Sequence, residues 1–128
     1  MFGLSKKKET VTITQSYSHD VHPKYLGTVA HRGYIYAFIE KDGTHKNDVL
    51  IVSSDARSTD KLVSIIMIGD NPEGDDVIKI RYNGRTRYIH RELVTFCKRT
   101  RLGDMIAPVS ADIMARVDEG LARGLGLI

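Results

Sequence analysis

The sequence is poor in the residues and runs that mark secreted and membrane proteins. It contains no tryptophan, three prolines and a single cysteine, Cys97. One cysteine cannot form an internal disulfide or a cysteine-cluster metal site, which is typical of a reducing compartment. The longest apolar runs, residues 34–39 and 62–68, are far shorter than the roughly 20 residues of a membrane-spanning helix. The lysines at 6–8 follow a few apolar residues, unlike the order in a secretory signal. We therefore expect a cytoplasmic protein without a membrane partner.

Several kinds of chemical site are also missing from the sequence. We find neither an HExxH pattern nor an EF-hand loop, and no glycine-rich loop of the P-loop or dinucleotide type. The sequence therefore predicts no metal and no cofactor. Cys97 follows an apolar stretch, so we expect an inert core thiol. With 128 residues, of which 41% are hydrophobic and 27% charged, the chain suits one folded domain.

Short apolar runs rich in β-branched residues follow one another from Val29 onward, as strands of a sheet do. Turn residues separate them, among them Asn83-Gly84, which is typical of a two-residue hairpin. This spacing predicts a mainly β fold, a small antiparallel barrel of about five to seven strands. The predicted strands span residues 34–39, 49–52, 62–68, 77–80 and 88–96.

The two ends of the chain differ from this middle part. Residues 1–28 alternate threonine with Val11 and Ile13 and then become polar, which predicts one short strand and a tether. We treat them as an N-terminal extension, followed by a barrel domain over residues 29–128. Near the other end, Ser110 is suited to cap a helix that docks on the barrel. The apolar stripe of this helix is Ile113, Val117, Leu121 and Leu125.

Positive charge is concentrated in one segment, residues 77–101. This segment has eight basic residues and one acidic residue, whereas the whole chain has a net charge of only +3. Such a charge suits a polyanion such as RNA or DNA, and a solvated strand face is the alternative explanation. From this segment we expect nucleic-acid contacts by Arg81, Arg85, Arg87 and Arg91.

Two side chains inside this basic segment can carry protons, His90 and Glu92. At positions i and i+2 of a strand they would face the same side of a sheet. When a 2′-hydroxyl of RNA attacks the adjacent phosphate, the reaction needs a base, an acid and donors to the phosphate oxygens. We therefore take His90 and Glu92 as candidate catalytic residues. The alternative is a structural histidine beside a glutamate that neutralises nearby arginines.

Several sequence segments after Val29 look like segments of a known protein family and occur in the same order. Residues 31–36 look like its opening strand, 49–55 like its second strand, and 92–102 like a later stretch that ends in Ser-Arg-Leu in the family. The final strand and helix agree best, ending in Leu-Gly-Leu at 125–127. In these segments the chain resembles the MazF/PemK/Kid toxins of bacterial toxin–antitoxin systems. The resemblance implies an SH3-like barrel with a C-terminal helix.

The resemblance also implies partners and an activity: a symmetric homodimer, metal-independent cleavage of single-stranded RNA, and inhibition by an antitoxin. Two usual active-site positions are altered. The arginine of the family's Arg-Pro-Val corresponds to Asn47, so that Lys46 or His45 is the nearest replacement for nucleic-acid binding, and a threonine corresponds to Gly69. The Arg-x-Asp of Kid-like members corresponds to residues 90–92.

These observations support three hypotheses. The first is a toxin-like endoribonuclease, an mRNA interferase, that an antitoxin holds inactive. The second is a catalytically degenerate module of the same fold that binds nucleic acid or a protein without cleavage. The third is a partner-binding domain whose basic strand faces an acidic chain such as an antitoxin tail.

Overall fold

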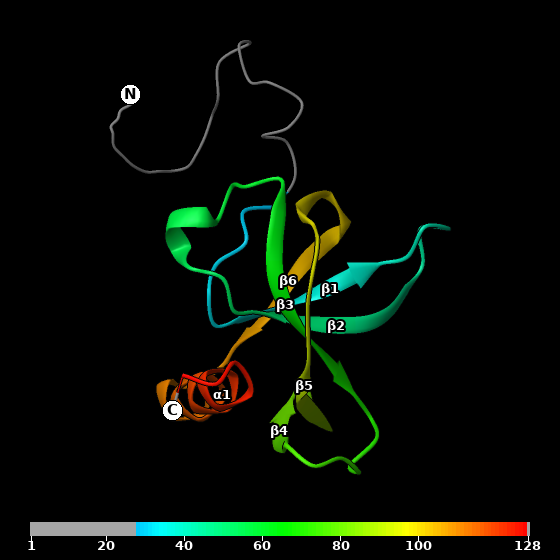
Figure 1. The fold of residues 1–128 in the computed structure, drawn as a ribbon. Coiled ribbons are helices and arrows are strands. Elements are labelled where there is room, and N and C mark those ends of the chain that lie inside the picture. Colours follow the sequence, from blue (N-terminus) through cyan, green and yellow to red (C-terminus); the bar gives the residue numbers. More distant parts are fainter. Residues whose placement is uncertain (1–27, 128) are drawn as a thin grey trace.

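The structure, a computed structural model, describes residues 28–127. Six strands form one antiparallel sheet in the order β4-β5-β3-β2-β1-β6, which curls into a half-barrel with one helix beside it (Figure 1). The predicted N-terminal strand and tether lie outside the described residues, except for Thr28. The elements are β1 (Tyr34–Ile39), β2 (His45–Ile51), β3 (Leu62–Gly69), β4 (Val77–Tyr82), β5 (Arg85–Lys98), β6 (Leu102–Pro108) and α1 (Ala111–Gly124).

The predicted mainly β class is confirmed, while several strand boundaries were wrong, most of all those of β2 and β5. β2 begins at His45, four residues before the predicted start, and β5 spans Arg85–Lys98 instead of 88–96. In both cases the missed residues are polar, yet they pair with a neighbouring strand. Asn83 and Gly84 have positive φ angles of 50° and 74°, as the predicted two-residue hairpin requires. Cross-strand pairing therefore extends the sheet beyond its apolar runs.

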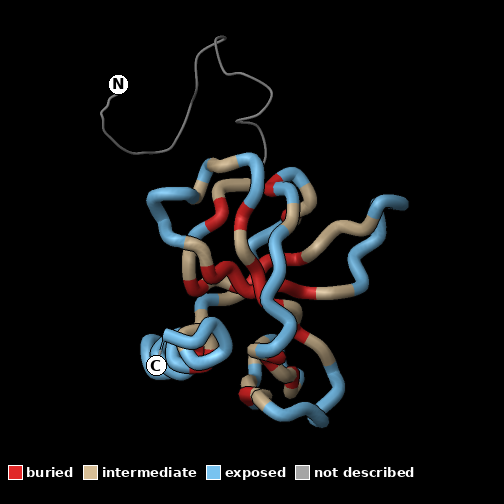
Figure 2. The backbone as a smooth tube through the Cα atoms, in the orientation of Figure 1, coloured by how far each residue is buried: buried red, intermediate tan, exposed pale blue. Residues whose placement is uncertain are grey.

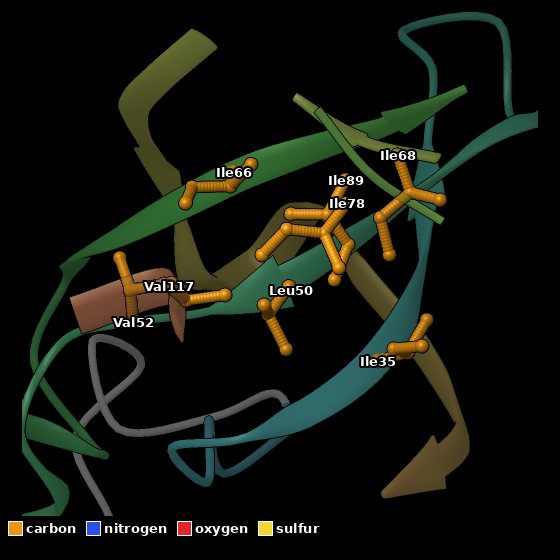
Figure 3. Packing of buried hydrophobic residues seen from close by; sticks show 8 residues of the cluster. All are labelled: Ile35, Leu50, Val52, Ile66, Ile68, Ile78, Ile89 and Val117. Carbon is orange, nitrogen blue, oxygen red and sulfur yellow. The ribbon is translucent and has the colours of Figure 1, made fainter. Parts of the chain in front are cut away.

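Apolar side chains on both faces of the sheet build two clusters. One contains Ile66 and Ile68 of β3 with neighbours from other strands and Val117 of α1 (Figure 3). The other contains Val63 and Ile65, also from β3, together with residues such as Tyr36. Alternate residues of a strand point to opposite faces, so β3 contributes to both clusters. Figure 2 shows the buried backbone gathered where the central strands cross.

Helix α1 closes one of these faces. The Ser110 side chain accepts a hydrogen bond from the backbone N–H of Ile113, which confirms the predicted cap. Val117 is fully buried, whereas Leu125 lies beyond the last helical residue and is exposed, so the apolar stripe is shorter than predicted. Among residues 28–127, α1 and the two short 3₁₀ turns are too short or too polar to cross a bilayer.

Strand β5 bends sharply near its middle. Ile89 pairs with Ile68 of β3, but the next recorded pair joins Val94 to Ile66. Residues 90–93 therefore bulge out of the ladder, which increases local twist and reorients side chains. This bend lies where the sequence places His90 and Glu92.

Ile66 is fully buried between α1 and the strands, so we expect its side chain to contribute strongly to the stability of the fold. Ile66→Ala removes core methylene groups and leaves a cavity, so we expect a loss of about 2–5 kcal/mol in the free energy of unfolding. Leu127→Ala, at a largely exposed position, should change stability by no more than about 0.5 kcal/mol. Urea unfolding of both variants tests this, and equal losses would contradict the packing described.

Candidate active site and nucleic-acid interface

His90 lies in a corner between the end of β3 and the loop of residues 70–76. A methyl group built on Gly69 would stand 3.9 Å from His90 Nε2, and one built on Gly74 would stand 3.6 Å from Nδ1. The residue is only 8% exposed. Glycines on both sides of the ring thus leave the space that the imidazole occupies.

Glu92 reaches the same corner across the β5 bulge. Its Oε1 lies 3.8 Å from His90 Nδ1, and its carboxylate is more exposed than the ring. The backbone alternation that predicted a shared face is interrupted here, because residues 90–93 leave the β3 ladder. The two side chains nevertheless come together. A carboxylate at this distance can help to orient the ring for proton transfer.

The loop over this corner is held at both ends by arginines. At its start, Arg85 Nη2 lies 3.2 Å from Asp70 Oδ1. At its end, Arg91 forms an ion pair with Asp76. Arg91 Nη1 also donates to the carbonyl of Arg116 in α1 at 2.6 Å. Arg91 therefore connects the loop, the strand and the helix.

Gly120 of α1 explains why Arg91 can lie so close to the helix. A Cβ at Gly120 would stand 2.5 Å from Arg91 Cδ, well inside contact distance. The absence of a side chain at this position lets the guanidinium pass over the helix backbone. Arg91, predicted to bind nucleic acid, thus has structural contacts in this conformation.

A second polar cluster lies on the opposite face of β5, centred on the buried carboxylate of Asp48. Oδ2 accepts hydrogen bonds from Tyr82 at 2.5 Å and from Arg87 Nη1 at 3.2 Å. The other oxygen, Oδ1, lies 2.6 Å from His45 Nε2. Burial, and then the contact with Asp48, raises the pKa of Tyr82, so its hydroxyl stays protonated and donates.

Arg87 is nearly as buried as Asp48 and is held from two sides. Its Nε lies 2.8 Å from Asp70 Oδ1, but the angle is too poor for a hydrogen bond and this nitrogen has no hydrogen-bond acceptor among residues 28–127. The contact with Asp70 is therefore an electrostatic attraction. A buried ion pair of this kind is costly to break from one side.

The predicted basic residues are divided between the two faces of the β4–β5 hairpin. Paired residues share a face, and the pairs Val77–His90, Lys79–Tyr88 and Arg81–Thr86 place two cations on the His90 side. The intervening pairs place Arg85 and Arg87 on the other side. Lys46 is exposed at the start of β2. The structure thus brings His90 and Glu92 together but separates them from Arg85 and Arg87.

No sequence pattern predicted the acidic partners Asp48 and Asp70 or the phenol of Tyr82 as part of this site. The only signal was an acid directly before the apolar run that begins at Val49. An acid that close to a buried strand requires a cation nearby. Its partner, Arg87, is distant in sequence, and only the register of three strands brings the two together.

Cys97 is half-buried on β5, and burial raises the pKa of its thiol to about 11. The thiol is therefore protonated at neutral pH and is a poor nucleophile. Within residues 28–127, no three histidine, cysteine, aspartate or glutamate side chains are arranged to hold a metal ion.

Several solved structures share this architecture. An endoribonuclease from a mycobacterial species superposes with a TM-score of 0.66 and 21% identity, over 79% of this chain and 95% of that one. A MazE-MazF complex from Deinococcus radiodurans gives a TM-score of 0.68 and 17% identity, over 78% and 98% of the two chains. The chain has the MazF fold. A mycobacterial endoribonuclease in complex with its cognate antitoxin is similar as well, with a TM-score of 0.66 and 22% identity over 77% and 96%.

Sequence comparison adds nothing to this likeness, because no protein-family model and no curated protein matches the chain. The resemblance to MazF toxins that the sequence motifs indicate is confirmed at the level of the fold. The MazF structures are covered almost completely.

Arg87 and Arg85 provide a matched pair for testing which arginine the fold requires. Arg87→Ala leaves the buried Asp48 carboxylate without its cation, and we expect a loss of about 3–5 kcal/mol in unfolding free energy. The Arg85 side chain is 63% exposed, so Arg85→Ala should cost at most about 1 kcal/mol. Thermal and urea unfolding measure both. An Arg87→Ala variant as stable as Arg85→Ala, with weaker RNA binding, would instead favour a phosphate contact.

Proposed function

We propose that this protein is a MazF-like endoribonuclease toxin that cleaves single-stranded RNA without a metal ion. The observation that carries the proposal is the corner occupied by His90 and Glu92. It lies against Gly69, where many MazF toxins have an active-site threonine. Asn47, at the position of the family's arginine, is next to Gly69 across the β2–β3 ladder, since Asp48 pairs with Ile68.

The proposed reaction is a transesterification within the RNA. The 2′-oxygen loses its proton and bonds to the adjacent phosphorus, while the bond from phosphorus to the 5′-oxygen breaks and that oxygen gains a proton. His90 and Glu92 are the proposed proton carriers, with Glu92 holding the imidazole. The products are a cyclic phosphate and a free 5′-hydroxyl. General acid–base groups of this kind contribute about 10²–10⁴ in rate.

The phosphate contacts come from the predicted basic residues. Arg81 lies on the His90 face of the hairpin, where its Nη1 donates to Thr86 at 3.1 Å and its side chain is exposed. Lys46 is exposed at the start of β2, and we propose both as direct contacts. His45, Arg85, Arg87 and Arg91 would bind RNA only if it displaced their present carboxylate or carbonyl partners.

The same proposal includes the binding partners of the protein. We propose that an antitoxin inhibits the protein, as one is bound in the mycobacterial complex, that two copies form a homodimer, and that the protein works in the cytoplasm. A groove between two copies would give a single strand more contact than one small domain offers.

A degenerate binding module is the second candidate, and the burial of His90 favours it. The loop of residues 70–76 covers the imidazole, and neither Asn47 nor Gly69 supplies the family's usual side chain. The basic residues would still bind a polyanion without catalysis. The two candidates differ in one measurable respect, the formation of defined RNA fragments.

His90→Ala tests the proposed chemistry with long single-stranded RNA in the presence of EDTA. Loss of a proton carrier should lower the cleavage rate by on the order of 100-fold or more, while RNA affinity stays within a few-fold. His31→Ala, at an exposed position near the start of β1, is the matched control and should cleave normally. Equal losses of rate and affinity would indicate a structural histidine, and tight binding without cleavage by the wild type would favour the binding module.

Sedimentation tests the proposed assembly separately from the chemistry. We expect a homodimer at micromolar concentration, because the proposed RNA groove requires two copies. Sedimentation velocity over a tenfold dilution measures its mass. A monomer that does not change on addition of RNA would count against the dimeric toxin.

A further inference from the structure

The outer half of β5 has a partner on only one side. The ladder with β4 ends at the pair Val77–His90, and the last bond on that side runs from Arg91 N to Asp76 O. Beyond this point, in the part of the chain that the structure describes, residues 94–98 pair only with β3. An unpaired strand edge is a ready template for another strand.

The groups that face this open edge can be identified from the register. The backbone N–H of Arg99 donates to the carbonyl of Lys61, next to β3, at 2.8 Å. Amides alternate in direction along an antiparallel strand. The N–H groups of Val94, Phe96 and Lys98 therefore point away from β3, toward the open edge.

Three large apolar side chains are exposed along this stretch of β5, among polar ones such as Thr95 and Lys98. Phe96 is 66% exposed, and Leu93 and Val94 are also among the large exposed apolar residues. Phe96 and Leu62 border a hollow that Arg57 also lines. In Figure 2 much of this half of β5 is drawn in pale blue. Apolar side chains beside unpaired amides are the features that a strand recognises when it adds to a sheet.

The described part of the chain begins near the C-terminal end of β5. Arg99, directly after β5, is buried, and its Nη1 donates to the carbonyl of Thr28 at 3.0 Å. The Thr28 hydroxyl donates to the carbonyl of Gly103 at 3.2 Å. Thr28 is therefore held close to the residue at which β5 ends.

The preceding segment has the length and composition of an added strand. Residues 10–14 read Thr-Val-Thr-Ile-Thr, a β-branched alternation, and residues 15–27 link them to Thr28. A linker of this length spans up to about 45 Å, whereas an edge over residues 94–98 is about 17 Å long. Attachment to the same chain gives an effective concentration of about millimolar, an advantage that a free partner lacks.

We propose that residues 10–14 add to the open edge of β5 as a further antiparallel strand, with Val11 and Ile13 packed beside Val94 and Phe96. The N-terminal extension is then part of the sheet and shields an edge that would otherwise recruit other chains. This assignment goes beyond the proposed RNA cleavage and does not depend on it.

Amide hydrogen exchange on the full chain tests this. In the wild type, the amides of Val94, Phe96 and Lys98 should exchange slowly. The double variant Val11→Pro/Ile13→Pro cannot form the added strand, because proline lacks the N–H group and interrupts pairing. The three amides should then exchange at least about tenfold faster. The control Ser16→Pro/Ser18→Pro changes the linker alone and should exchange as the wild type does.

Two results would overturn the proposal. One is equal exchange at the three amides in the wild type and the Val11→Pro/Ile13→Pro variant. The other is protection that disappears on dilution of the wild type, because a second copy would then cover the edge. The amides of Thr95 and Cys97 face β3 and report on the fold, so they should stay protected in every variant.

Discussion

The burial of β3 on both faces is the constraint on which the rest of the structure depends. Ile66 and Ile68 pack toward α1, while Val63 and Ile65 pack into the other cluster. A strand buried on both sides has little freedom of register, since a one-residue slip would exchange every side chain between the two cores. β2 and β5 both pair with β3, so the register of β3 also sets the positions of these two strands.

The position of the candidate site follows from that register. β3 ends at Gly69, beside Tyr88 of β5, and β5 leaves the ladder directly after Ile89. His90 thus stands at the point where a rigid pair of strands gives way to a bulge, beneath a loop held by arginines at both ends. A site on such a boundary is a loop-borne site positioned by a rigid scaffold, as binding sites often are.

The number of basic residues in a segment of this sequence differs from the number of cations that the segment exposes on the surface of the fold. Residues 77–101 are strongly basic in sequence. In the structure Arg87 is buried against Asp48, Arg91 lies against α1, and Arg99 donates to backbone carbonyls. Of the cations that remain exposed, Lys79 and Arg81 lie on one face of the hairpin and Arg85 on the other, while Lys98 lies at the end of β5. The segment therefore presents a smaller field to a polyanion than the count of basic residues suggests.

Much of the architecture was predictable from local patterns, because those patterns reflect local physics. The hairpin at Asn83-Gly84 follows from residues that tolerate positive φ, and the cap at Ser110 from a side chain that satisfies a free N–H group. The apolar runs located the strands, although polar ends such as that of β2 were missed, since pairing rather than apolar composition extends them.

The sequence by itself determined the mainly β class, the C-terminal helix and the basic, histidine-bearing strand, because each depends on neighbours in the chain. Only the tertiary structure decided that Asp48 meets Arg87, that a bulge brings His90 and Glu92 together, and that glycines make room for His90. These features depend on the register between strands distant in sequence. Register is set by the sum of many apolar contacts across the sheet, and no local pattern contains that sum.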